Sequence, residues 1–143
     1  MAEPRERMEW SEVGFAARTL AERVLEDDYR PDMLLSIARG GLVVGGALAY
    51  ALDVKNTFTM NVDLDEARVL VVDDVADTGR TLALVKDFCS GSVGETRLAV
   101  LYEKPRSIVR CEYVWRRTDR WIDFPWSAQG PVEAPSPVAA RAD

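Results

Sequence analysis

Apolar runs and segments of helical spacing alternate along the chain. Residues 69–72 are four apolar residues in a row, and residues 33–38 and 96–102 are mostly apolar. Unbroken runs of this kind are typical of strands buried on both faces of a parallel sheet. Helical spacing or apolar, small-residue composition predicts helices over 10–25, 42–52 and 82–88. The alternation predicts an α/β fold, in which a mostly parallel, twisted sheet is flanked by helices.

The remaining segments complete one domain over residues 1–130. β-branched content and alternation predict a strand over 54–62, and a further short strand is expected over 112–115. The aromatic-rich residues 117–130 are expected to form a small C-terminal hood. Residues 131–143 are rich in Pro and Ala, which predicts an extended or partly disordered tail.

Composition excludes several kinds of protein. The chain has 143 residues, 48% hydrophobic and 29% charged, which fits one soluble globular domain. Its formal net charge of −6 argues against nucleic-acid binding, and the absence of histidine excludes His-based triads and His metal sites. Cys89 and Cys111 have no metal-binding spacing and are expected to be reduced thiols. No signal-peptide core or membrane-spanning run is found, so we expect a cytoplasmic protein.

Candidate chemistry begins directly after the strand at 69–72. Asp73 and Asp74 follow the apolar run, and residues 77–81 read Asp-Thr-Gly-Arg-Thr. In open α/β folds, ligands bind at the carboxyl ends of strands. A helix that starts near Thr78 would offer backbone N–H groups and a positive dipole end to a phosphate. Adjacent carboxylates can accept hydrogen bonds from sugar hydroxyls and can bind Mg²⁺, so a ribose 5-phosphate fits this segment.

This segment resembles the phosphoribosyl pyrophosphate signature of type I phosphoribosyltransferases. A generic strand–turn–helix or a response-regulator receiver explains the acidic pair alone, but not the Thr-Gly-x-Thr turn that follows it. The resemblance implies the type I phosphoribosyltransferase fold and an Mg²⁺-dependent glycosyltransferase. Asp73 and Asp74 would hold the ribose hydroxyls and Mg²⁺. The 5-phosphate would bind to the turn residues Ala76, Asp77, Thr78, Gly79, Arg80 and Thr81.

A second strand–turn–helix unit lies at residues 38–42, Ala-Arg-Gly-Gly-Leu. Glycine allows a backbone to approach a ligand closely. The segment resembles the pyrophosphate-binding loop of the same family, which implies that Arg39 and Gly40 bind the pyrophosphate. The resemblance also implies an unusual peptide bond, such as a cis bond, between Ala38 and Arg39.

The third group of motifs is Tyr-Glu-Lys-Pro at 102–105 and Trp-Ile-Asp-Phe-Pro-Trp at 121–126. With the first two, these motifs resemble bacterial xanthine-guanine phosphoribosyltransferases, which salvage 6-oxopurines. The resemblance implies that Lys104 donates to O6 of the purine and that Trp121 stacks on it. It further implies that Ile122 reads the purine edge through its backbone and that Asp77 handles a proton. The catalytic residues are then Asp73, Asp74 and Asp77.

The chain departs from the family in three places. Asp123, a possible additional metal ligand, and Phe124 replace other side chains near the purine 2-position, so the choice among guanine, xanthine and hypoxanthine stays open. Arg80 replaces a glycine of the turn. Near residues 62–67, active members usually carry a long mobile loop. Either the natural chain is shortened here or loop residues are omitted from the sequence, and we favour omission because flexible loops often escape observation.

The expected activity is transfer of the phosphoribosyl group from phosphoribosyl pyrophosphate to N9 of a 6-oxopurine, with release of diphosphate. Two alternatives remain open. One is a phosphoribosyltransferase for another base, and the other is a non-catalytic regulator that binds phosphoribosyl pyrophosphate or a nucleotide. The resemblance also implies a homo-oligomer, a dimer or a tetramer.

Overall fold

The computed structural model describes residues 3–55, 57 and 65–133. Its strands are β1 (Arg5–Arg7), β2 (Met33–Ser36), β3 (Arg68–Ala76), β4 (Glu95–Glu103), β5 (Tyr113–Arg117) and β6 (Trp121–Asp123). Its helices are α1 (Trp10–Glu26), α2 (Gly40–Leu52), α3 (Arg80–Ser90) and the 3₁₀ helix η1 (Pro125–Ser127). Among the described residues, no helix combines the length and apolar character required to cross a membrane.

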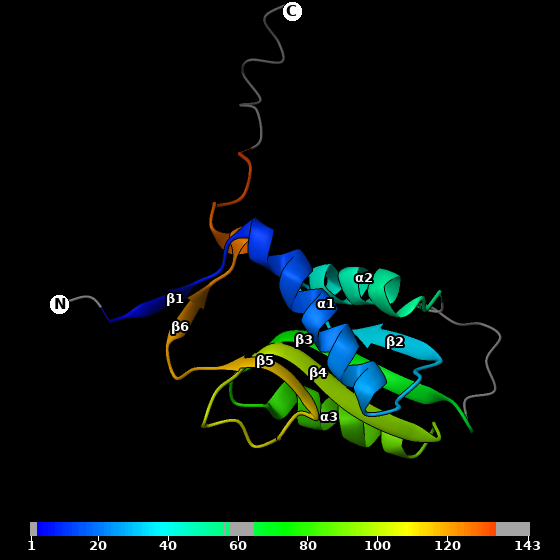
Figure 1. Ribbon diagram of the computed structural model, residues 1–143. Coiled ribbons are helices and arrows are strands. Elements are labelled where there is room, and N and C mark those ends of the chain that lie inside the picture. The colour runs from blue at the N-terminus through cyan, green and yellow to red at the C-terminus, as the bar shows by residue number, and fades with distance from the viewer. Residues whose placement is uncertain (1–2, 56, 58–64, 134–143) are drawn as a thin grey trace, which may run out of the picture.

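The main sheet is parallel throughout. Its strand order is β2-β3-β4-β5, and each pair of neighbours runs in the same direction. Helices α1 and α2 lie on one face of this sheet, and α3 lies on the other (Figure 1). This arrangement confirms the α/β fold expected from the alternation of apolar runs and helical segments.

The strand β3 explains why an unbroken apolar run is required. Successive side chains of a strand point to opposite faces of its sheet. Leu70 and Val72 pack with α1 and α2, whereas Val69 and Val71 pack with the cluster beneath α3. All four side chains are fully buried. The strand is therefore apolar on both faces because both faces are covered by helices.

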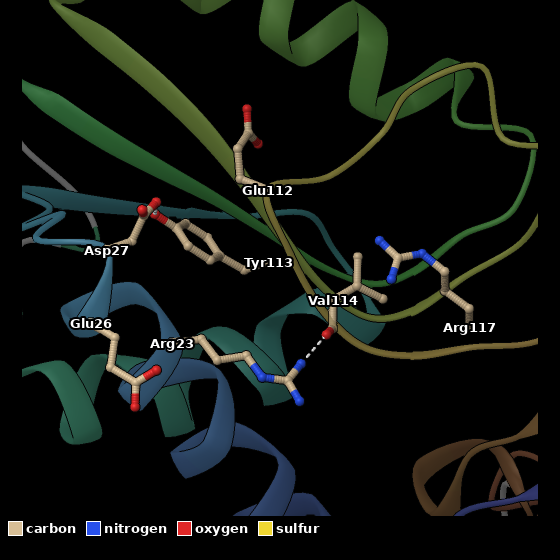
Figure 2. A pocket seen from close by; sticks show the side chains of 7 residues that line it. All are labelled: Arg23, Glu26, Asp27, Glu112, Tyr113, Val114 and Arg117. Atoms are coloured by element: carbon tan, nitrogen blue, oxygen red, sulfur yellow. Dashed lines mark hydrogen bonds between the residues drawn. The ribbon is translucent and has the colours of Figure 1, made fainter.

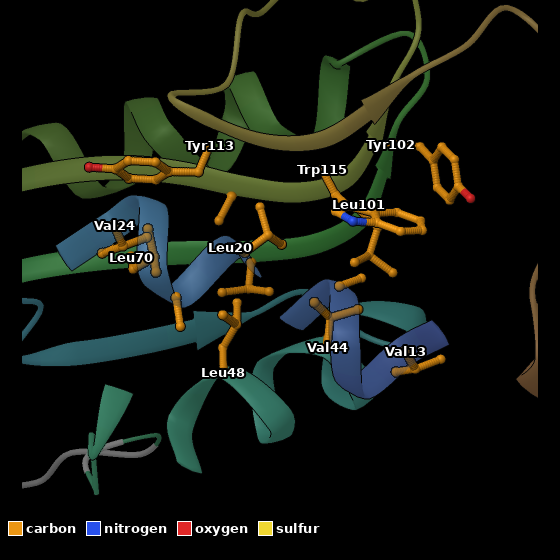
Figure 3. Packing of buried hydrophobic residues seen from close by; sticks show 14 of the residues in the cluster. Val13, Leu20, Val24, Val44, Leu48, Leu70, Leu101, Tyr102, Tyr113 and Trp115 are labelled. Carbon is orange, nitrogen blue, oxygen red and sulfur yellow. The ribbon is translucent and has the colours of Figure 1, made fainter. Parts of the chain in front are cut away.

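The larger core lies between the sheet and helices α1 and α2 (Figure 3). The six apolar residues of α1 at helical spacing are all buried: Val13, Ala16, Ala17, Leu20, Ala21 and Val24. Val44 and Leu48 of α2 join them against the sheet. The buried positions of α1 recur at helical spacing, as in an amphipathic helix. Burial of this apolar face therefore holds α1 against the sheet.

A separate two-stranded sheet forms the hood. β1 pairs with β6 in parallel, and the register joins Arg5 to Trp121. After β6, the rings of Phe124 and Trp126 stack with centroids 4.7 Å apart, and Trp10 of α1 meets Trp126 edge-on at 5.9 Å. The hood therefore includes the N-terminal strand as well as the predicted C-terminal segment, and aromatic packing fixes it to α1.

Two expectations fall largely outside the described residues. The predicted strand over 54–62 is one of them, and most of the predicted tail over 131–143 is the other. The domain boundary at residue 130 stays a prediction.

The full sequence joins α2 to β3 through residues 53–67 without a break. The interpretation that loop residues are omitted there is therefore wrong, and the connection is short in this chain.

Candidate active site

The predicted site residues follow neighbouring strands at one edge of the sheet. β2 is followed by Arg39, β3 contains the acidic pair, and β4 is followed by Lys104. Because these strands are parallel, their carboxyl ends lie at the same edge. A cleft of about 1110 Å³ at this edge is lined by Ile37, Ala38, Arg39, Gly40, Val43, Asp73, Asp74, Val75, Thr81, Phe124, Trp126, Ser127, Gln129, Gly130, Pro131 and Val132. The cleft therefore brings together the predicted ribose, pyrophosphate and phosphate segments.

The two carboxylates of the acidic pair are held by the backbone of β3. The Asp74 N–H donates to Asp73 Oδ1, and the Val75 N–H donates to Asp74 Oδ1, each at 2.8 Å. Burial, followed by the nearby charge of Asp74, raises the pKa of Asp73 to about 8. A cationic group or a hydrogen-bond donor entering the cleft would stabilise the ionised pair, because each lowers the cost of placing two negative charges side by side.

The start of α2 packs directly against this pair. A Cβ atom at Gly40 would lie 1.8 Å from Asp74 Oδ2, and one at Gly41 would lie 2.7 Å from the Val72 carbonyl oxygen. Both distances are far below van der Waals contact, so only glycine allows this approach. The peptide bond between Ala38 and Arg39 is cis, as the resemblance implied.

The turn between β3 and α3 has the form expected of a phosphate-binding segment. α3 begins at Arg80 rather than at Thr78. Gly79 adopts a left-handed conformation with φ of 78°, and a Cβ atom there would lie 2.4 Å from Ser107 Oγ. The first N–H groups of a helix have no intrahelical acceptor and favour an anion. The turn therefore requires glycine and places a helix N-terminus beside the cleft that Thr81 lines.

Two of the three predicted purine-binding residues, Lys104 and Trp121, line a second, smaller pocket. It has a volume of about 320 Å³ and is lined by Glu3, Lys104, Pro105, Arg106, Asp119 and Trp121. Lys104 Nζ lies 5.6 Å from the Trp121 ring centroid and 3.6 Å from Asp77 Oδ1. The structure thus places Lys104 close to both Trp121 and Asp77. The pocket that Lys104 and Trp121 line is separate from the cleft that the acidic pair lines.

Two residues of the hood segment differ in what they can contribute. The Ile122 side chain is buried in the main core, which leaves only its backbone for a ligand. Asp123 does not join the acidic pair. Its two oxygens accept hydrogen bonds from Arg5 Nε and Nη2 at 2.7 and 2.5 Å, and these bonds lower the pKa of Asp123. Among the described residues, no three His, Cys, Asp or Glu side chains are placed to hold a metal. The possible metal role of Asp123 stays a prediction.

The acidic pair nevertheless suits a magnesium ion that is shared with a substrate. Carboxylate oxygens are preferred Mg²⁺ ligands, and Mg²⁺ is commonly bound by one or two carboxylates together with substrate phosphates rather than by a complete protein cage. Asp73 and Asp74 provide those two carboxylates at the lining of the cleft. Burial and the charge of Asp74 raise the pKa of Asp73, and a cation bound to the pair would favour its ionised form.

Sequence reasoning missed several residues of this region. Trp126 lines the cleft of the acidic pair beside Phe124, which was expected near the purine 2-position, and the density of aromatic residues over 119–126 is the signal that points to Trp126. Arg106 contacts Asp77, and no local pattern singles it out. Glu103 is 2% exposed and accepts a hydrogen bond from the Cys111 N–H at 2.8 Å. Its carboxylate anchors the segment that follows Lys104.

A third pocket lies away from these residues, between the end of α1 and β5 (Figure 2). It is lined by Arg23, Glu26, Asp27, Glu112, Tyr113, Val114 and Arg117. Arg23 donates to the Val114 carbonyl oxygen, and the Tyr113 hydroxyl donates to Asp27. Several of its polar groups thus already bind other protein groups, and none of the predicted site residues lines it.

Comparison with known proteins identifies the family of the chain. A model of the phosphoribosyl transferase domain matches residues 55–132. The xanthine-guanine phosphoribosyltransferase of Desulfotalea psychrophila is 28% identical over 146 residues, covering 88% of each chain. The purine phosphoribosyltransferase of Pyrococcus horikoshii Ot3 is 32% identical, with a TM-score of 0.77 and coverage of 92% of this chain and 99% of that one.

A more distant structure shares the fold. The xanthine-guanine-hypoxanthine phosphoribosyltransferase of Helicobacter pylori is 20% identical, with a TM-score of 0.76 and coverage of 87% of this chain and 93% of that one. The family match spans most of the site, from the acidic pair to the hood. Together, the parallel sheet, the acidic pair at its edge and these similarities show that the chain belongs to the phosphoribosyltransferase family and has its type I fold.

Proposed function

We propose that the protein transfers the phosphoribosyl group of phosphoribosyl pyrophosphate to N9 of a 6-oxopurine (guanine, xanthine or hypoxanthine) and releases diphosphate. The observation that carries the proposal is the shared cleft, in which Arg39, Gly40, Asp73, Asp74 and Thr81 lie at one edge of the sheet. The names of the relatives from D. psychrophila and P. horikoshii support a purine as the acceptor.

The ribose binds to the acidic pair. Asp73 and Asp74 accept hydrogen bonds from its two hydroxyls, and their negative charge stabilises the positive charge that develops at the anomeric carbon. They are also the residues that would hold Mg²⁺, which supplies positive charge next to the diphosphate oxygens. The turn over residues 76–81 binds the 5-phosphate, and this remote binding energy positions the reacting carbon.

The leaving diphosphate lies against Arg39 and Gly40. The bond between the anomeric carbon and its oxygen breaks, and its electron pair departs with the diphosphate. N9 of the purine forms the new bond to the anomeric carbon, and Asp77 accepts the proton that the base loses. The guanidinium of Arg39 neutralises part of the departing charge, since arginine stays protonated and binds phosphate oxygens in pairs.

The base binds in the second pocket. Lys104 donates to O6, and because an ammonium group can only donate, it favours an oxo group over an amino group. Trp121 is 58% exposed and offers an open ring face for stacking. The backbone of Ile122 reads the purine edge. We further propose that the protein acts in purine salvage as a cytoplasmic homo-oligomer.

One assay tests the proposal directly. The purified protein is incubated with Mg²⁺, phosphoribosyl pyrophosphate and each of guanine, xanthine, hypoxanthine, adenine and uracil. We expect nucleotide and diphosphate only with the 6-oxopurines, and no product after Mg²⁺ is removed with EDTA. If product formed only with adenine or only with uracil, the protein would be a phosphoribosyltransferase for that base instead. No product with any base would contradict the enzymatic assignment.

The short connection between α2 and β3 favours a second candidate function. Residues 53–67 leave little chain for a loop that closes over a bound diphosphate, and water exclusion protects a cationic sugar centre from hydrolysis. A protein with this cleft but without such closure fits a regulator that binds phosphoribosyl pyrophosphate or a nucleotide. Calorimetric binding of phosphoribosyl pyrophosphate with no turnover in the assay above would identify that function.

A further inference from the structure

We infer that Arg106 is a positioning residue for recognition of the base. It holds the Asp77 carboxylate and thereby leaves the Lys104 ammonium group free to donate to a purine. The inference rests on the proposed function, because Lys104 and Asp77 are the side chains proposed to act on the base.

Arg106 and Lys104 compete for one oxygen of the Asp77 carboxylate. Arg106 Nε donates to Asp77 Oδ1 at 2.7 Å, and Arg106 Nη2 lies 2.5 Å from the same oxygen. Lys104 Nζ lies 3.6 Å from that oxygen, which is too far for a good hydrogen bond. Two cationic side chains therefore converge on Asp77 Oδ1, and Arg106 makes the shorter contacts.

Lys104 is buried, whereas Arg106 is exposed. The Lys104 side chain is only 8% exposed, whereas the Arg106 side chain is 64% exposed. A buried ammonium group needs acceptors, and Asp77 is the carboxylate with which Lys104 forms its ion pair. Without Arg106, Lys104 would close on Asp77 and turn its donors away from the pocket that it shares with Trp121.

Hydrogen bonds that do not involve the Arg106 side chain hold the backbone around it. The Ile108 N–H donates to the Thr78 carbonyl oxygen at 2.8 Å. The guanidinium group of Arg110 donates to the two carbonyl oxygens on either side of Arg106, at 3.2 and 3.1 Å. Removing the Arg106 side chain should therefore leave the segment in place, so an effect on catalysis would come from the Asp77 contact rather than from loss of the fold.

Steady-state kinetics with Mg²⁺, phosphoribosyl pyrophosphate and guanine, xanthine or hypoxanthine provide the first test. We expect Arg106→Ala to raise KM for the base about tenfold. Lys104 would turn to Asp77, and the charge-assisted contact between Lys104 and the purine would be lost. KM for phosphoribosyl pyrophosphate should change less than about twofold. Arg106→Lys should restore part of the loss, because it keeps the charge but lacks the guanidinium fork. Arg18→Ala, at an exposed position of α1, is the matched control.

Crystal structures of the same variants provide a test that does not depend on turnover. In Arg106→Ala, Lys104 Nζ should move within hydrogen-bond distance of Asp77, and in Arg18→Ala it should not. An unmoved Lys104, kinetics equal to those of Arg18→Ala, or an equal rise of both KM values with a lower thermal midpoint would each overturn the inference. If the wild-type protein turns over no base, the proposed function fails, and the position of Lys104 still decides the inference.

Discussion

The ribose–phosphate half of the site and the base half are built in different ways. The first half consists of adjacent residues on β3, the turn that follows, and the start of α2, which packs against them through glycine. The second half consists of side chains that come from three separate segments, at Asp77, Lys104 and Trp121. Backbone geometry thus fixes the first half, whereas long-range packing and ion pairs place the second. We therefore expect mutations in the first half to affect the chemical step and mutations of Lys104 and Trp121 to affect affinity for the base, while Asp77, which lies in the turn and pairs with Lys104, joins the two halves.

The largest expected effect is that of Asp74→Asn. The substitution keeps the size of the side chain but removes a negative charge next to the anomeric carbon. We expect kcat to fall by about 10²-fold or more, as for other losses of transition-state charge stabilisation, while KM for the purine changes little. Measured kcat and KM with guanine check this. A loss of equal size in purine affinity would contradict the division of the site into two halves.

The next effect is that of Gly40→Ala. The new Cβ atom would lie 1.8 Å from Asp74 Oδ2, so the carboxylate or the start of α2 must move. We expect the free energy of unfolding to fall by about 1–3 kcal/mol, as for other overpacked positions, and kcat to fall with it. Urea unfolding and kinetics provide the measurement.

Gly46→Ala is the matched control in the same helix. No heavy atom lies within 4 Å of its added Cβ atom. It should stabilise α2 by about 0.4–1 kcal/mol, because alanine has less backbone freedom to lose on folding. Equal behaviour of the two variants would show that α2 does not need its close approach to Asp74.

A smaller effect is expected from Lys104→Met, which tests the base half. Methionine keeps the apolar stem but removes the donor to O6, so KM for guanine should rise about tenfold. The KM for phosphoribosyl pyrophosphate should stay the same within about twofold. A parallel rise in both values would show that the two pockets act as one.

A separate effect, on stability rather than on kinetics, concerns pH and Asp73. Its pKa is about 8 in the folded protein, raised from 3.8, because it is buried next to Asp74. The folded state therefore binds more protons than the unfolded state in this window, and stability should fall as pH rises from about 4 to about 8. Urea midpoints measured in EDTA check the slope, and Asp73→Asn should flatten it. Stability that rises across the same window in the wild-type protein and not in the variant would contradict the burial of this carboxyl group.

Much of the first half could be predicted from the sequence because its parts are close in the chain. An apolar run buried on both faces, an acidic pair and a Thr-Gly turn specify a strand, its end and a helix start within residues 68–81. The close approach of the backbone at Gly40 was also readable, but the left-handed conformation of Gly79 is known only from the structure.

The base half was predicted less completely. The aromatic residues indicated a hood and a stacking role for Trp121, but not that Trp121 would line one pocket while Trp126 lines another. The pairing of β1 with β6 joins residues far apart in the chain and gives Asp123 an arginine partner that no local pattern predicts. Arg106 has no local pattern at all. Its role depends on where β4 places the following segment relative to Asp77.

The sequence by itself determined the α/β class, the buried strands and the identity of the ribose–phosphate segment. Each of these depends on side chains a few residues apart, whose spacing sets which face they occupy. Only the tertiary structure decided which charges meet and how the cleft divides into two pockets. Those contacts form between segments distant in sequence, and hydrophobic periodicity carries no information about which cation a given carboxylate will face.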